Sequence, residues 1–193
     1  MEELKKAPVT VLLILANILV FTAVEFTGGS EDTMHMLQCG AAYTPAIMQG
    51  EYYRIFTSMF LHFGPQHLGN NMLVLFVLGG RLERTVGKLK YLLIYLLGGM
   101  GGNLLCLFLE LDSADFAVSA GAVFAVMGAM IYAVIRGRGH IEDLSARQVV
   151  IMAAFSLYFG FTSEGVDNAA HVGGLICGFL LAVLLYHPSQ RAG

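Results

Sequence analysis

Residues 117–128 of this 193-residue chain read AVSAGAVFAVMG. The stretch carries no charge, and its small residues Gly121, Ala125 and Gly128 recur every three or four positions. Residues with that spacing share one face of an α-helix, and a stripe of small residues lets two helix backbones approach closely in lipid. The stretch therefore predicts a membrane helix that packs tightly against a partner helix.

The last apolar segment, AAHVGGLICG, supplies a matching stripe. Its small residues Ala170, Gly174 and Gly178 recur at every fourth position. Because both stripes suit close helix contact, we predict that they face each other. Such a contact brings the side chain of His171 within reach of residue 120.

The composition of the whole chain agrees with a membrane domain. Hydrophobic residues make up 56% of the sequence and charged residues only 13%, so we expect a single all-α membrane domain over residues 1–193. Most of its apolar segments approach the roughly 20 residues that a helix needs to cross a bilayer, although the fifth is short. The six predicted helices cover approximately residues 9–27, 67–83, 89–109, 116–135, 148–162 and 169–186.

Basic residues indicate the orientation of these segments. If the N-terminus is cytoplasmic, the cytoplasmic side holds all of the 11 Lys and Arg residues except Arg54. An excess of Lys and Arg marks the cytoplasmic side of membrane proteins. Both termini are therefore predicted to be cytoplasmic, and the second, fourth and sixth helices are predicted to begin at the outer side.

The long connection at residues 28–66 is expected to be structured. It contains the partly apolar run YYRIFTSMFLHF, and an irregular loop of that length is rare in a compact domain. We predict short helices that lie partly in the outer leaflet and pack on the bundle.

Several function classes find no support in the sequence. The net charge of −3 and the absence of a basic cluster argue against nucleic acid as a partner. Neither an HExxH motif nor a similar carboxylate–histidine spacing occurs, so a metalloprotease is not expected. The polar residues of the apolar segments gather at one end, which argues against a channel or transporter path.

Polar side chains in membrane helices are costly and mark functional sites. His67 and Asn71 are four residues apart at the start of the second segment, so they share a helix face. Residue 120 and His171 lie a similar number of residues below the outer ends of the fourth and sixth segments. The predicted topology thus brings these four positions to one depth in the outer half of the membrane.

Four motifs in this order resemble one known family. The sequences HLGNN, GGRLERTVG, AGAVFAVMG and NAAHVGGLICG, spread over six apolar segments, are similar to the rhomboid intramembrane serine proteases. The similarity covers nearly the whole chain, from the first segment to the sixth. It implies a six-transmembrane-helix bundle with a long, partly helical first loop.

The resemblance also implies roles for individual residues. His171, in AHVGG, corresponds to the general base of the family. His67 and Asn71 correspond to the donors that bind the oxyanion. Gly121 corresponds to the residue that follows the nucleophile, and Phe124 to the aromatic residue that packs on the catalytic histidine.

Further implications concern supporting residues and partners. His62 corresponds to a structural histidine before the second helix, and Glu83 to a polar anchor between helices. The implied function is cleavage of transmembrane segments of membrane proteins by a serine–histidine dyad, without metal or organic cofactor. The implied location is a bilayer, here the bacterial inner membrane, with the active site open to the outside; no oligomeric state is indicated.

The chain departs from the family at the position of the nucleophile. Aligning GAVFAVMG with the family motif puts Ala120 where the catalytic serine belongs, and alanine has no hydroxyl group to attack with. We favour a rhomboid protease made inactive by a Ser-to-Ala replacement at this position. A natural pseudoprotease that binds transmembrane helices without cleaving them is the alternative. Ser119 as the nucleophile is disfavoured, because one residue turns a helix by about 100° and would direct that side chain away from His171.

Overall fold

Apolar segments of the sequence are helical in the computed structural model, which describes residues 6–109, 116–117, 121–162 and 168–187. The principal helices are α2 (Pro8–Thr27), α6 (Gly64–Val74), α7 (Gly80–Val86), α8 (Lys88–Leu109), α9 (Gly121–Arg136), α10 (Ala146–Thr162) and α11 (Asn168–Leu185). A π-helical turn, η2 (Leu75–Gly79), joins α6 to α7. By length and hydropathy, α2, α8 and α11 suit a membrane span, while α9 and the apolar part of α10 are shorter.

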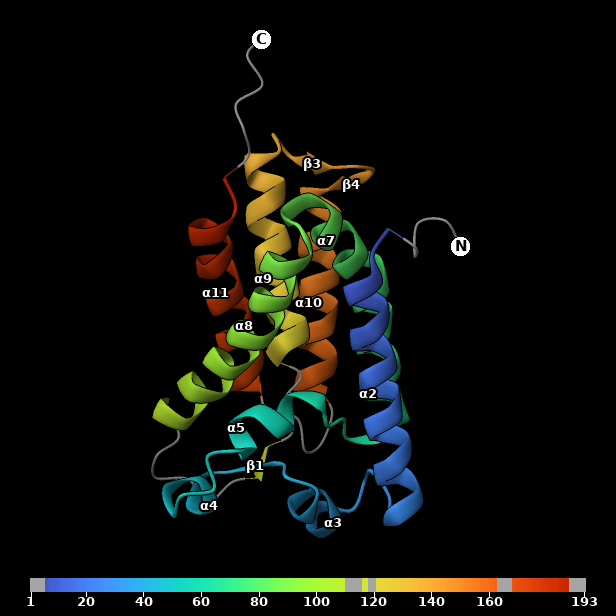
Figure 1. The fold of residues 1–193 in the computed structure, drawn as a ribbon, viewed down its shortest axis with the longest axis vertical. Coiled ribbons are helices and arrows are strands. Elements are labelled where there is room, and N and C mark those ends of the chain that lie inside the picture. Colours follow the sequence, from blue (N-terminus) through green and yellow to red (C-terminus); the bar gives the residue numbers. More distant parts are fainter. Residues whose placement is uncertain (1–5, 110–115, 118–120, 163–167, 188–193) are drawn as a thin grey trace.

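Shorter elements lie at the two ends of the bundle (Figure 1). Between α2 and α6 the chain forms α3 (Thr33–Gln38), β1 (Ala42–Tyr43), α4 (Thr44–Met48), α5 (Arg54–Thr57) and the 3₁₀ turn η1 (Ser58–Phe60). At the opposite end, β3 (His140–Ile141) and β4 (Leu144–Ser145) form an antiparallel hairpin between α9 and α10. Helix α2 begins, and α11 ends, at this second end (Figure 1).

The fourth apolar segment starts differently from the prediction of a helix over 116–135. Phe116 and Ala117 form strand β2, which pairs antiparallel with β1 in the register Ala42–Ala117 and Tyr43–Phe116. Their backbone groups bond to another strand instead of to a helix. Helix α9 is described from Gly121 onward.

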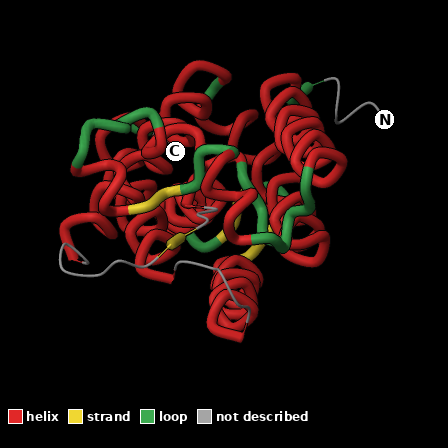
Figure 2. Tube along the Cα trace, turned by 90° about the horizontal axis from the view of Figure 1, so that it is seen from below, coloured by secondary structure: helices red, strands yellow, loops and turns green. Residues whose placement is uncertain are grey.

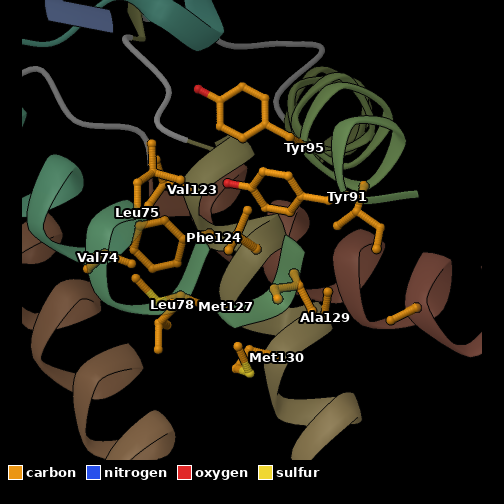
Figure 3. Close-up of a cluster of buried hydrophobic side chains, with 14 of the residues drawn as sticks. Val74, Leu75, Leu78, Tyr91, Tyr95, Val123, Phe124, Met127, Ala129 and Met130 are labelled. Atoms are coloured by element: carbon orange, nitrogen blue, oxygen red, sulfur yellow. The ribbon is translucent and has the colours of Figure 1, made fainter. Parts of the chain in front are cut away.

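Helix α9 occupies the centre of the bundle, among α8, α10 and α11 (Figure 1). Its residues are buried almost throughout, as expected for a helix that is apolar on every side. Viewed from below, the chain is mostly helix, with helices seen close to end-on (Figure 2). Phe124 and Met127 of α9 pack with Leu75 and Leu78 of η2 in the main hydrophobic core (Figure 3).

Small residues bring α9 and α11 into backbone contact, as the two stripes predict. A Cβ atom added to Gly174 would collide with the carbonyl oxygen of Gly121, and one added to Gly178 with that of Ala125. A Cβ atom at Gly128 would collide with the backbone of α11 in turn. Only glycine permits this separation of the two helices.

Helix α8 joins the same tightly packed core. A Cβ atom on Gly102 would lie 2.7 Å from both the Ala170 carbonyl oxygen and the Gly174 nitrogen of α11. On the α9 side, Gly99 faces Ala122, with 2.8 Å left between an added Cβ and the Ala122 methyl group. Helices α8, α9 and α11 therefore pack against one another at close backbone separation.

Polar contacts attach helix α2 to this bundle. The N-cap residue Ala7 offers no side-chain acceptor, and the buried carboxylate of Glu83 on α7 takes its place. Glu83 accepts hydrogen bonds from the backbone N–H groups of Val9 (3.1 Å) and Thr10 (2.8 Å) and from the Thr10 hydroxyl (2.8 Å). A carboxylate at this position satisfies free N–H groups and interacts favourably with the helix dipole. Glu83 is thus a polar anchor between helices, as its sequence motif implies.

Two polar side chains anchor the segment between α2 and α6. The Arg54 guanidinium donates to the carbonyl oxygens of Leu37 (2.7 Å) and Ala41 (2.9 Å), which ties α5 to the α3 region. On α8, the Asn103 amide donates to the carbonyl oxygen of Ile55 (2.8 Å) and thereby fixes α5 to the bundle. These bonds hold the connection against the helices at the end where α6 begins.

Ion pairs secure the β3–β4 hairpin to α7. Arg81 contacts both carboxylate oxygens of Asp143, at 2.9 and 3.0 Å, and Arg84 contacts both of Glu142 at 2.8 Å. Hydrogen bonds from the two arginines lower the pKa of these carboxyl groups below its usual range. Glu142 has a φ of 53°, a left-handed conformation that is uncommon for residues other than glycine, and in this conformation it pairs with Arg84.

Candidate active site

A cavity of about 210 Å³ lies between α6, α9, α10 and α11. Its walls combine aromatic rings with amide, imidazole and hydroxyl groups, as is common in ligand sites. No carboxylate of the described part of the chain lines it. The lining residues are Gln66, His67, Asn70, Asn71, Phe124, Ser156, Phe159, Gly160 and His171.

The start of α6 directs two polar side chains into the cavity. Gly64 has a φ of +80°, a conformation that glycine adopts readily, and Pro65 follows in the first turn of the helix. One turn of helix then separates His67 from Asn71, so both side chains lie on the same face. Asn71 is almost fully buried.

His171 projects from the first turns of α11 and packs on α9. Its ring stacks on Phe124 with 4.1 Å between ring centroids and an interplanar angle of 15°. Both side chains are about 1% exposed. Stacking on one face limits rotation of the imidazole, so its ring nitrogens point in fixed directions.

Three histidines follow one another across the site. The ring centroid of His67 lies 5.9 Å from that of His171 and 5.2 Å from that of His62, with both pairs edge-on. His62 precedes α6, and its Nδ1–H group donates a hydrogen bond to the Phe60 carbonyl oxygen, 3.3 Å away. The His67 ring is thus in edge-on contact with two other imidazoles, those of His62 and His171.

The polar atoms at the centre of the site are buried and unpartnered. Both ring nitrogens of His67 and of His171, and both amide atoms of Asn71, have no hydrogen-bond partner within the described ranges. Burying such groups without partners costs free energy, and native proteins rarely tolerate it outside functional sites. Their concentration around one cavity indicates a place where a substrate or water binds.

Most of the residues that the sequence singled out meet here. His67, Asn71, Phe124 and His171 line one cavity, and His62 packs against the ring of His67. Gly121, the first described residue of α9, contacts Gly174, which lies three residues after His171. Ala120, the predicted nucleophile position, and its neighbours Val118 and Ser119 lie outside the described residues.

Several residues in or beside the site were not identified from the sequence, among them the lining residues Gln66 and Phe159. Ser156 and Gly160 of α10 line the cavity, and Asn168 at the start of α11 lies next to Gly160. The spacing of Asn168 and His171, three residues apart, was the one available signal. No feature of the sequence pointed to Ser156 and Gly160 of α10, because serine and glycine are common in apolar helices.

Comparisons with known proteins are consistent with each other. A family model described as Rhomboid domain matches residues 49–188. The chain is similar to Rhomboid protease GluP of Bacillus subtilis (strain 168), with 35% identity over 188 residues, which cover 97% of this chain and 36% of GluP. It is also similar to Rhomboid protease AarA of Providencia stuartii, with 32% identity over 200 residues, 90% of this chain and 71% of AarA. The chain therefore spans little more than a third of GluP but most of AarA.

Proposed function

This chain belongs to the rhomboid family, and on that premise we propose that its fold is that of an intramembrane serine endopeptidase. The substrates are transmembrane segments of membrane proteins, and the catalytic groups are a serine–histidine dyad. The observation that carries the proposal is the cluster of unpartnered polar atoms of His67, Asn71 and His171 around one cavity. With Ala120 at the nucleophile position, the chain is the inactive Ser-to-Ala form.

The first half of the reaction follows from these residues. In the Ala120→Ser form, the serine hydroxyl attacks the carbonyl carbon of the scissile bond while His171 accepts its proton. The N–H groups of His67 and Asn71 then donate hydrogen bonds to the oxyanion, and each such donor is worth about 3 kcal/mol in serine hydrolases. As the carbon–nitrogen bond breaks, the same proton passes from His171 to the leaving amine.

Hydrolysis of the acyl-enzyme repeats these steps with water. His171 takes a proton from the water, the hydroxide adds to the ester carbonyl, and the serine leaves with the proton that His171 returns. The amides of Gln66 and Asn70 and the hydroxyl of Ser156 give the cavity a polar lining, which suits the entry of water into a membrane site. Neither half of the reaction requires a metal or an organic cofactor.

A pseudoprotease is the second candidate, and the sequence itself supports it. Ala120 leaves the base and the oxyanion donors without a nucleophile. A chain with alanine as its natural residue would still offer the same cavity to an unwound transmembrane segment. Its function would be to bind such segments without cleaving them.

We extend the proposal to the placement of the chain in the membrane. The apolar helices make it an integral membrane protein, and we assign six spans to α2, α6–α7, α8, α9, α10 and α11. The end at which α2 begins and α11 ends (Figure 1) also carries Arg81 and Arg84, which supports cytoplasmic termini. The site then opens toward the outside of a bacterial inner membrane.

Restoring the hydroxyl tests the proposed activity. We expect the Ala120→Ser protein in detergent or liposomes to cleave a single-span substrate and to react with a fluorophosphonate probe at residue 120. His171→Ala in that background should remove both activities, whereas the original chain should show neither. A folded Ala120→Ser protein that neither cleaves nor reacts across a panel of substrates would refute the protease and favour the pseudoprotease.

A further inference from the structure

Asn168 and His171 lie on one face of α11, in contact with α10. They are three residues apart, so their side chains are neighbours on the helix surface. Gly160 of α10 faces both: a Cβ atom added there would lie 2.5 Å from Oδ1 of Asn168 and 3.0 Å from Nδ1 of His171. The missing side chain of Gly160 therefore leaves one small space that both atoms border.

These two atoms are chemically matched. Oδ1 of Asn168 and Nδ1 of His171 are both buried, and neither has a hydrogen-bond partner in the described part of the chain. Oδ1 lies 2.5 Å, and Nδ1 3.0 Å, from the position of a Cβ atom on Gly160. The two atoms can therefore be no farther apart than the sum of these distances. One water molecule with two hydrogen bonds of about 2.8 Å spans such a separation, and a small side-chain rotation permits a direct bond.

The base of a serine hydrolase needs an acceptor at this nitrogen. A proton on Nδ1 leaves the lone pair of Nε2 free to take the proton of the attacking hydroxyl, and a hydrogen bond to the Nδ1–H group fixes that tautomer. A carboxylate commonly serves, but no carboxylate lines the described cavity. Among the described residues, the titratable groups near the His171 ring are His67, in direct ring contact, and His62, in contact with His67. A neutral amide supplies the acceptor without placing a charge in a buried site.

We propose that Asn168 is the positioning residue for His171: its Oδ1 accepts the Nδ1–H hydrogen bond, directly or through one water, in the space that Gly160 leaves open. The inference rests on the proposed function, since it assigns His171 the role of base. Asn168 contacts no reacting atom and acts only through the tautomer and direction of the imidazole.

The first test needs no catalytic activity and uses the chain with Ala120. In protein labelled with ¹⁵N-histidine, nitrogen chemical shifts identify the tautomer of His171, whose signals are assigned by their loss in His171→Gln. We expect the Nδ1–H tautomer in the original chain and in Asn168→Asp, and a shift toward Nε2–H in Asn168→Leu. An unchanged tautomer in folded Asn168→Leu would overturn the inference.

A second variant guards against misfolding at position 168. Gly160→Ala fills the space between the two groups and should shift the tautomer as Asn168→Leu does. Gly69→Ala is its matched control, because a Cβ atom there meets no atom within 4 Å. The same tautomer in Gly160→Ala as in Gly69→Ala would also contradict the inference.

Kinetics in the Ala120→Ser background separate this inference from the proposed function. Asn168→Leu should lower kcat about tenfold, the equivalent of roughly one hydrogen bond, with KM little changed, and Asn168→Asp should restore part of the loss. If Ala120→Ser is inactive while the tautomer still depends on Asn168, the proposed function fails and the hydrogen bond stands. If Ala120→Ser cleaves and Asn168→Leu changes neither kcat nor the tautomer, Asn168 has no such role.

Discussion

Replacing single glycines by alanine measures how rigidly α9 and α11 are held together. In Gly178→Ala the new methyl group would overlap the carbonyl oxygen, carbonyl carbon and Cα of Ala125. These are backbone atoms, so no side chain can rotate away and the helices must separate. Overpacking costs about 1–3 kcal/mol even where side chains adjust, and we expect a loss of about 3 kcal/mol in the free energy of unfolding.

Alanine at two other glycine positions provides a reference for the loss in free energy of unfolding expected for Gly178→Ala. In Gly101→Ala the methyl group would meet Sγ of Cys177 at 2.9 Å, which can turn aside, so we expect a change near zero. In Gly69→Ala it meets open space, and the loss of backbone freedom in the unfolded chain should stabilise by about 0.5–1 kcal/mol. The three variants should therefore unfold in the order Gly178→Ala, Gly101→Ala, Gly69→Ala as the denaturant increases.

Pulse proteolysis over a series of SDS mole fractions in mixed micelles provides the measurement. The fraction of intact protein gives the unfolding midpoint of each variant, and the original chain serves as the reference. If Gly178→Ala unfolds at the same SDS fraction as Gly69→Ala, backbone contact between α9 and α11 does not limit their separation, and the packing argument is refuted.

Further expectations concern other parts of the molecule. Glu83→Ala should lower the free energy of unfolding in SDS by about 2 kcal/mol because α2 loses its cap, and Glu83→Gln should lose less; equal midpoints for Glu83→Ala and the original chain would contradict this. The pKa of Asp143 is lowered in the folded state, so its ion pair stabilises the folded hairpin above the unfolded pKa of about 4, and this stabilisation is lost as the pH falls further. Proteolysis of the hairpin should therefore increase below that pH. Arg81→Gln, which lacks the ion pair, should show the increase already at neutral pH. Asn103→Leu should expose the α5 region to hydrogen exchange without changing exchange in α9; protected α5 amides would count against the anchor. In the Ala120→Ser background, Phe124→Leu should lower kcat more than it changes KM. Measuring kcat and KM at one pH tests this expectation.

The packing of the central helices was predictable from the sequence. Glycine and alanine recur at helical spacing in both segments, and close backbone contact is the physical use of such stripes. The contacts of Gly174 with Gly121 and of Gly178 with Ala125 confirm this prediction. Counting residues from the ends of the segments also brought His67 and His171 to the same depth, and their rings lie 5.9 Å apart.

Contacts between distant parts of the chain were not predictable in the same way. Phe116 and Ala117 are apolar and read as the start of a helix, but a strand partner more than seventy residues earlier in the chain takes up their backbone groups. The sequence could not predict that Asn168 is a partner of His171, because the space that both side chains border is left by Gly160, which lies on another helix. The spacing of residues in the sequence predicts well which of them share a helix face. It predicts which two faces contact each other only where both helices carry a recognisable motif, such as a stripe of small residues.

The cap on α2 has a consequence for biosynthesis. Helix α2 leaves the ribosome before α7, yet the carboxylate that completes its first turn belongs to a residue of α7, 73 positions downstream. Likewise, the hydrogen bond from the Asn17 amide to the Tyr95 hydroxyl can form only after a residue 78 positions later has been made. Until α7 and α8 have been made, α2 can enter the membrane but cannot reach its final position. Helix α2 is therefore synthesised before the residues that fix it in place.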